Sequence, residues 1–337
     1  MNLKETLKTL CAPPGVSGIE TAASEVARRL LSEYMPNAGI DSFGTVWGVV
    51  KYNDGMPLLL LDAHIDEIGM VVNFIDKNGF LKVSNAGGID RRVLPAASVT
   101  VWGGTPLKGV VCTLPPHVQK DSGKAIQADE IAIDCGLTKE SAEKRISLGD
   151  TVTIDADFAE LQNGMITARA LDDRAGVAAI LYALDLLKNK NPRYNLAVTF
   201  SSQEELGCRG AGISAFNINP DCAVAVDVSY GDYPGGAENK TWKLGAGVMI
   251  GISPVLDREL FDKMKDTAQR NNIPCQIEVM GGKTGTDADS ISVARAGVRC
   301  ALLSIPLRNM HTPVEAVSLS DIENTGRLIA GFVLGDN

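Results

Sequence analysis

The chain has 337 residues, more than one compact core usually covers, and its 45% hydrophobic and 22% charged residues are typical of a folded protein with two domains. The net charge of −9, without a long run of Lys or Arg, argues against a nucleic-acid partner. The seven cysteines lack CxxC spacing. The N-terminus lacks the apolar core of a signal peptide, and no apolar stretch reaches the roughly 18 to 20 residues that span a bilayer. We therefore expect free thiols, no membrane partner and a cytoplasmic location.

The first expected elements are a helix and two strands. Ser17 and Glu20 have the spacing of a capping box, and apolar residues recur at helical spacing over 23–31. Strands are expected over Thr45–Tyr52 and Pro57–Asp62. The second is almost continuously apolar, which is typical of a strand buried on both faces.

The middle of the chain has a different character. Between about Gly69 and Gly164, long helical patterns are scarce and short β-prone runs are separated by Gly, Pro and Asn; the runs are 70–75, 99–102, 109–114 and 151–154. The polar stretch His117–Glu130 is expected to be a flexible loop. This pattern predicts a small β-barrel or sandwich inserted into a larger domain.

From residue 170 onward, helices and strands alternate. The expected elements are a helix over 177–187, strands over 196–202 and 222–228, a helix over 258–271, the segments 287–296 and 299–304, and a last helix from a Ser320/Glu323 capping box. Such alternation predicts an α/β sheet with helices on both faces.

Histidines and acidic residues follow several of these strands, at the sheet edge where open α/β sheets bind ligands. His64 comes directly after the buried strand, and Asp66 can accept a hydrogen bond from its second ring nitrogen, as carboxylates behind metal-bound histidines commonly do. The alternative is a strand-end histidine with a chance acidic neighbour. His311 precedes a turn, where a lone histidine is usually structural or exposed.

Acidic residues occupy comparable positions. Asp172 and Asp173 precede a helix, where acids often serve only as caps. Glu204 and Glu205 end one apolar strand, and Asp227 ends another. If these carboxylates lie in solvent they need no partner, but if they are buried they need a compensating positive charge. Taken together, these donors predict a site for two divalent metal ions. The charges would balance, because three of the carboxylates and a bridging hydroxide carry the four negative charges that two dications need. Oxygen and imidazole donors suit Zn²⁺, Co²⁺ or Mn²⁺.

Several segments, spread in order over nearly the whole chain, resemble the M42 family of metallo-aminopeptidases, which includes the glutamyl aminopeptidases and the tetrahedral TET peptidases. The segments are AHIDEIG (63–69), GGIDRRVLP (87–95), ALDDRAG (170–176), SSQEELGCRGA (201–211), VDVSYGDYPG (226–235), GTDAD (285–289) and IPLRNMHTPVE (305–315).

The resemblance implies a role for each site residue. His64 and Asp227 would be terminal ligands of one metal, Glu205 and His311 of the other, and Asp172, rather than Asp173, would bridge them. Glu204 would be the general base that activates a metal-bridged water, and Asp66 would orient His64. The implied reaction is removal of N-terminal residues from short peptides, with two divalent ions per subunit, Zn or Co.

The resemblance also implies an architecture. A three-layer α/β/α catalytic domain of the dinuclear zinc peptidase type would comprise residues 1–68 and 165–337, and residues 69–164 would form the inserted β-barrel-like dimerisation domain. Homo-oligomers are expected, either dimers or dodecamers built from dimers. His117 falls in the insert and is expected to be structural or part of a subunit contact, not a ligand.

The same residues are compatible with other functions to different degrees. The same ligands would serve a dinuclear-metal carboxypeptidase or deacylase, and only the resemblance favours the amino end of the substrate. A metal-independent glycosidase would leave both histidines without a role, and 5% aromatic residues offer few sugar platforms. A non-catalytic scaffold would be expected to lack some ligands. The sequence does not indicate which N-terminal side chain of a peptide substrate would be preferred.

Overall fold

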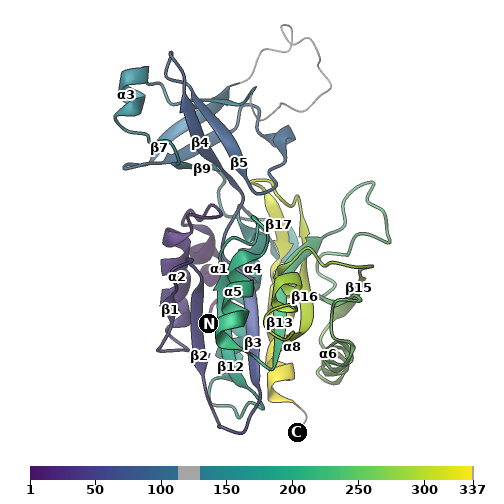
Figure 1. Ribbon diagram of the computed structural model, residues 1–337. Helices are drawn as coiled ribbons and strands as arrows, with labels where there is room; N and C mark the ends of the chain where they lie inside the picture. Colours follow the sequence, from purple (N-terminus) through teal and green to yellow (C-terminus); the bar gives the residue numbers. More distant parts are fainter. Residues whose placement is uncertain (113–129, 336–337) are drawn as a thin grey trace.

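The computed structural model describes residues 1–112 and 130–335. It contains a closed six-stranded barrel and, below it in Figure 1, an eleven-stranded sheet covered by helices. The sheet has the order β1-β2-β12-β3-β13-β16-β17-β11-β10, with β14 paired to β16 and β15 paired to β14. This arrangement confirms the predicted α/β fold with a small inserted barrel.

The sheet is assembled from strands distant in the sequence. Their bounds are β1 Gly39–Ile40, β2 Val46–Val50, β3 Leu58–His64, β10 Ala159–Glu160, β11 Met165–Ala168, β12 Asn195–Ser201, β13 Cys222–Tyr230, β14 Val248–Ile252, β15 Cys275–Val279, β16 Arg299–Arg308 and β17 Glu315–Ser318. At its centre, β3 runs parallel to both β12 and β13, and β13 runs parallel to β16. The carboxyl ends of these strands therefore meet at one edge of the sheet.

Helices cover both faces, as the alternation of elements predicts. On one face, buried side chains of α1, α2, α4, α6 and α8 share a core with residues such as Leu59 and Leu61. On the other face, α5 and α7 pack against Leu60, whose side chain points the opposite way along β3. The helices are α1 Leu3–Cys11, α2 Thr21–Leu31, α4 Leu171–Leu187, α5 Arg209–Ile218, α6 Arg258–Arg270, α7 Asp287–Ile291 and α8 Leu319–Leu334.

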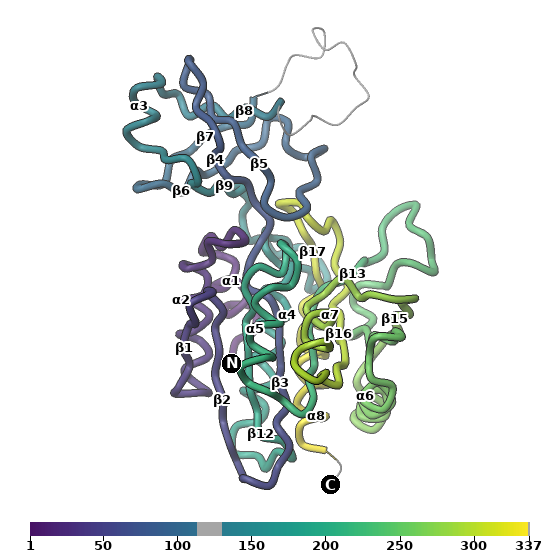
Figure 2. Tube along the Cα trace, in the orientation of Figure 1, coloured from purple at the N-terminus to yellow at the C-terminus, as the bar shows by residue number. Residues whose placement is uncertain are grey.

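The barrel lies beyond the edge where the central strands end, and the chain enters it directly after β3 (Figure 2). It has its own hydrophobic core, which includes Met70, Leu81 and Val99. Its elements are β4 Gly69–Ile75, β5 Leu81–Ala86, β6 Ser98–Trp102, β7 Leu107–Cys112, β8 Ala132–Asp134, the short helix α3 Lys139–Glu143 and β9 Thr151–Ile154. Residues 117–129 of the expected loop, including His117, lie outside the described residues.

Both predicted capping boxes are wrong. α2 begins after Glu20, whose carboxylate caps no helical N–H and instead accepts hydrogen bonds from the backbone N–H groups of Gly18 and Gln203. α8 begins after Ser318, and the hydroxyl of Ser320 pairs with that of Ser318. Glu20 thus pairs with Gly18 and Gln203, and Ser320 pairs with Ser318, so neither side chain makes the hydrogen bond that a capping box requires.

Arg174 in α4 joins the sheet domain to the N-terminal segment. Its side chain is fully buried and donates hydrogen bonds to the carbonyls of Leu10 (2.9 Å), Pro13 (2.7 Å) and Ile65 (3.3 Å). It also forms an ion pair of 3.1 Å with the buried Glu67, which contacts Arg169 as well. The buried guanidinium thus satisfies three backbone carbonyls and the buried carboxylate of Glu67.

Replacing Arg174 with Met is therefore expected to lower the free energy of unfolding by about 3–5 kcal/mol, because three backbone carbonyls lose their donor and the buried Glu67 keeps only Arg169 of its two cationic partners. Urea unfolding of metal-free protein measures this. Arg299→Met is the control, since Arg299 pairs with Asp257 at the surface and should cost at most about 1 kcal/mol. Equal losses in the two variants would contradict the structural role given to Arg174.

Candidate metal centre

The structure brings the five predicted ligands together at the carboxyl edge of the central strands. His64 ends β3, Asp227 lies near the end of β13, and Asp172 stands at the start of α4. Glu205 and His311 come from the loops that follow β12 and β16. These five residues line one cavity of ≈ 450 Å³.

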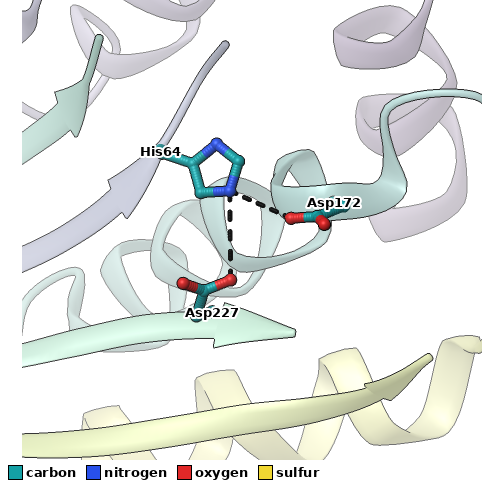
Figure 3. A group of neighbouring side chains, drawn as sticks. All are labelled: His64, Asp172 and Asp227. Atoms are coloured by element: carbon teal, nitrogen blue, oxygen red, sulfur yellow. Dashed lines mark hydrogen bonds and ion pairs between the residues drawn. The ribbon is translucent and has the colours of Figure 1, made fainter. Parts of the chain in front are cut away.

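His64, Asp172 and Asp227 form the first group (Figure 3). The Nε2 atom of His64 is 2.9 Å from Asp172 Oδ1 and 3.9 Å from Asp227 Oδ1. One potential ligand atom from each residue lies within 4.8 Å of the others. All three side chains are buried, so a cation between them would be largely removed from solvent.

Asp172, Glu205 and His311 form the second group. The Nε2 atom of His311 is 3.5 Å from Asp172 Oδ2 and 3.4 Å from Glu205 Oε1. Asp172 thus belongs to both groups and directs a different carboxylate oxygen to each histidine. This is the arrangement expected of a carboxylate shared by two cations.

The neighbouring Asp173 is placed differently. Its carboxylate is fully buried, belongs to neither group, and accepts a hydrogen bond of 3.0 Å from the backbone N–H of Gly176 in α4. Asp173 therefore behaves as a residue of the helix start, whereas Asp172 faces the cavity. The geometry favours Asp172 as the shared ligand.

Asp66 contacts more than the predicted histidine. Its Oδ1 atom is 3.6 Å from His64 Nδ1, which lies closer, at 3.2 Å, to the Asp66 backbone carbonyl. The carboxylate instead accepts hydrogen bonds from the backbone N–H groups of Glu204 (3.0 Å) and Glu205 (3.2 Å). Asp66 therefore positions the loop that carries both glutamates as well as facing His64.

Asp66→Asn removes one of these acceptor oxygens, so we expect metal affinity or turnover to fall by about 10- to 100-fold. Asp76→Asn is a matched control, because Asp76 also accepts two backbone N–H groups, from Asn78 and Phe80, but lies in the barrel. Metal titration and steady-state kinetics of both variants test this. A loss confined to Asp76→Asn, or shared equally, would exclude the positioning role.

Sequence reasoning missed Glu315 as a site residue, although it lies in the IPLRNMHTPVE segment. Glu315 is buried, and its two carboxylate oxygens accept hydrogen bonds from the backbone N–H groups of Asp172 and His311, each with an N–O distance of 3.1 Å. The ring of His311 is held from its other side, where Nδ1 lies 2.9 Å from the carbonyl of Gly88. A Cβ atom at Gly88 would come within 2.8 Å of that ring, which explains the glycine.

Negative charge is concentrated in this cavity. Burial, together with repulsion from Asp172, raises the pKa of Glu205 to about 8. Burial also raises the pKa of Glu204, and burial and neighbouring acids raise the pKa of Asp227 well above its usual value. The carboxylates therefore lack sufficient positive charge among the described residues, and cations would relieve their repulsion.

The two histidines respond to the same charge. Burial opposes protonation of His64, but its contacts with Asp172 and Asp66 raise its pKa well above the usual value. The contact with Asp172 raises the pKa of His311 to about 9. Metal ions compete with protons for such nitrogens, so these histidines would release protons when cations bind.

Glu204, the predicted base, lines the cavity with the ligands. Its Oε1 atom accepts a hydrogen bond of 3.3 Å from the thiol of Cys208, a neighbour that sequence reasoning did not identify. Asp287, in the GTDAD segment, lies beside this pair and is 3% exposed. Burial and repulsion from Asp62 raise the pKa of Asp287 well above its usual value.

The cysteines and the lengths of the helices concern the chain as a whole. All seven cysteines are unpaired in the structure, which agrees with the expected free thiols. Among the described residues, no helix is long and apolar enough to span a bilayer.

Comparison with known proteins links this geometry to a family. Residues 44–328 match the model of the M42 glutamyl aminopeptidases. A lysyl aminopeptidase of Pyrococcus furiosus is 32% identical over 96% of this chain and 94% of its own length. Among solved structures, aminopeptidase APDkam598 from the archaeon Desulfurococcus kamchatkensis has a TM-score of 0.93 and 34% identity, covering 98% of this chain and 94% of that one. The Pyrococcus horikoshii TET1 peptidase, described as assembling into a tetrahedron or a large octahedral shell, has a TM-score of 0.85 and 30% identity, covering 98% and 99%.

Proposed function

The chain belongs to the M42 family of aminopeptidases, and from this premise we propose that it removes N-terminal residues from short peptides with the help of two divalent cations. His64 and Asp227 would hold one ion, Glu205 and His311 the other, and Asp172 both. The observation that carries this proposal is that the two oxygens of Asp172 face different histidines, at 2.9 and 3.5 Å.

The residues fit such a pair of ions. The donors are imidazole nitrogens and carboxylate oxygens without a thiolate, a set that suits Zn²⁺ or Co²⁺. The crowded carboxylates, whose pKa values are raised by burial and by each other, need positive charge in this cavity. The ring of His311 is already oriented through the carbonyl of Gly88, as is usual for a metal ligand.

When bound, the ions supply Lewis acidity for the scissile carbonyl and make a water molecule more acidic. The chain's own residues handle the protons. The carboxylate of Glu204, whose pKa is raised by burial, accepts a proton from the attacking water and delivers it to the nitrogen of the leaving peptide. Asp66 and Cys208 hold this glutamate in place through its backbone N–H and its Oε1 atom.

Assays with free and N-acetylated forms of the same peptides test the proposed reaction. We expect cleavage of the free peptides only, and loss of that activity after chelation with recovery on adding Zn²⁺ or Co²⁺. Preference for the acetylated form would support a deacylase, and release of the C-terminal residue would support a carboxypeptidase. Cleavage of a glucan that persists in the presence of a chelator would support a metal-independent glycosidase.

We further propose that the chain works as a cytoplasmic homo-oligomer, either a dimer or a dodecamer built from dimers, with residues 69–164 as the dimerisation domain. Its similarity to the TET1 peptidase supports assembly, and its unpaired cysteines support a reducing compartment. The barrel also exposes the apolar side chains of Phe74 and Val110. Native mass spectrometry of wild-type protein and of Phe74→Glu would test this, because the substitution should shift the population toward smaller species.

A further inference from the structure

A second acidic feature lies in the same cavity as the proposed metal ligands. Glu278 in β15 lines that cavity, although only 4% of its surface is exposed. The hydroxyl of Ser229 donates a hydrogen bond of 2.5 Å to its Oε1 atom, and that of Ser304 donates one of 2.7 Å to its Oε2 atom. Each carboxylate oxygen is thus held by one serine.

The two serines place Glu278 next to the metal centre. Ser229 is two residues beyond Asp227 on β13, so the two side chains point to the same face of the sheet. Ser304 on β16 is the direct register partner of Asp227. Glu278 therefore forms part of the cavity wall on the side of Asp227.

This carboxylate has no cationic partner among the described residues. Burial raises the pKa of Glu278, and the two serine hydrogen bonds lower it, with no contribution from a Lys or Arg. A buried carboxylate without a compensating charge is costly, so a wall of this kind is best suited to a ligand that carries a positive charge.

The rest of this wall matches the stem of such a ligand. Met280 and Leu302 line the cavity, each two residues from one member of the Glu278–Ser304 pair. Thr284 adds a neutral side chain. Apolar side chains beside the Glu278 carboxylate suit a long aliphatic chain with a cationic end, which describes Lys and Arg.

We propose that Glu278 binds the positively charged side chain of an N-terminal Lys or Arg and so sets the substrate preference of the enzyme. This inference rests on the proposed function. The serines hold one lone pair of each carboxylate oxygen, which leaves further lone pairs for an ammonium group or for the paired N–H groups of a guanidinium.

The decisive comparison is between lysyl and norleucyl substrates. Norleucine has the aliphatic stem of lysine without the ammonium group, and both substrates carry the same free α-amino group. Their ratio of kcat/KM therefore isolates recognition of the side-chain charge from recognition of the α-amino group.

The experiment measures kcat/KM of metal-loaded enzyme with lysyl, arginyl, norleucyl and glutamyl fluorogenic amides. The proteins compared are the wild type, Glu278→Gln and the control Glu259→Gln, whose side chain is exposed at the surface. Wild type should prefer lysyl over norleucyl substrate. In Glu278→Gln, the lysyl-to-norleucyl ratio should fall roughly 10- to 100-fold, the range expected for a charge-assisted hydrogen bond. Glu259→Gln should keep the wild-type ratio.

Each other outcome has a distinct meaning. Equal losses for lysyl and norleucyl substrates in Glu278→Gln would overturn the proposal, and so would a wild-type preference for norleucyl or glutamyl substrate. Wild-type enzyme that cleaves none of the amides would count against the proposed peptidase function instead. Cleavage of norleucyl substrate by wild type establishes the reaction independently of Glu278.

Discussion

Glu204→Gln is expected to lower kcat by about 10²- to 10⁴-fold while leaving the metal content unchanged. The glutamine side chain has nearly the same size and can still accept the hydrogen bond from Cys208 at its oxygen. It cannot take up a proton at neutral pH, so the attacking water loses its base. The measurement combines steady-state kinetics with elemental analysis of the same preparation.

Glu205→Gln is the matched control for this experiment. Glu205 is the adjacent residue, and Asp66 holds the backbone N–H groups of both glutamates. Because Glu205 faces His311 at 3.4 Å, its substitution should lower metal occupancy as well as turnover. Near-normal turnover in Glu204→Gln would remove the assignment of this residue as the base.

Asp172→Asn is expected to reduce the affinity for both ions and to leave little activity. This single substitution removes charge from the residue that faces His64 and His311 at once. Asp173→Asn provides the contrast, because its carboxamide oxygen can still accept the N–H of Gly176. Metal content after gel filtration and activity on reloading distinguish the two variants. If Asp173→Asn lost both ions and Asp172→Asn retained them, the shared ligand would be Asp173.

The parts of the fold that the sequence predicts well are those with strong local patterns. The apolar runs of β3, β12 and β13 are each buried throughout most of their length, and such runs specify buried parallel strands. Because parallel strands end at a common edge, the polar residues in the last positions of these strands or directly after them could be expected to meet there. That expectation covers His64, Asp227 and Glu205.

Features that depend on tertiary partners could not be predicted in the same way. The carboxylate of Glu20 is used by Gly18 and Gln203 and not by a helix end. The acceptor role of Asp66 requires the loop after β12 to lie against it, which the HxD spacing does not indicate. Glu278 becomes a cavity residue only because β15 pairs with β14 and brings it beside Ser229 and Ser304.

The central claim is that segments far apart in the sequence form one centre for two cations. A crystal structure of zinc-loaded protein, with anomalous diffraction recorded at the zinc absorption edge, tests it most directly. We predict two anomalous peaks per chain with the Asp172 carboxylate between them, one beside His64 and the other beside His311. A single peak, or peaks away from these two histidines, would contradict the account.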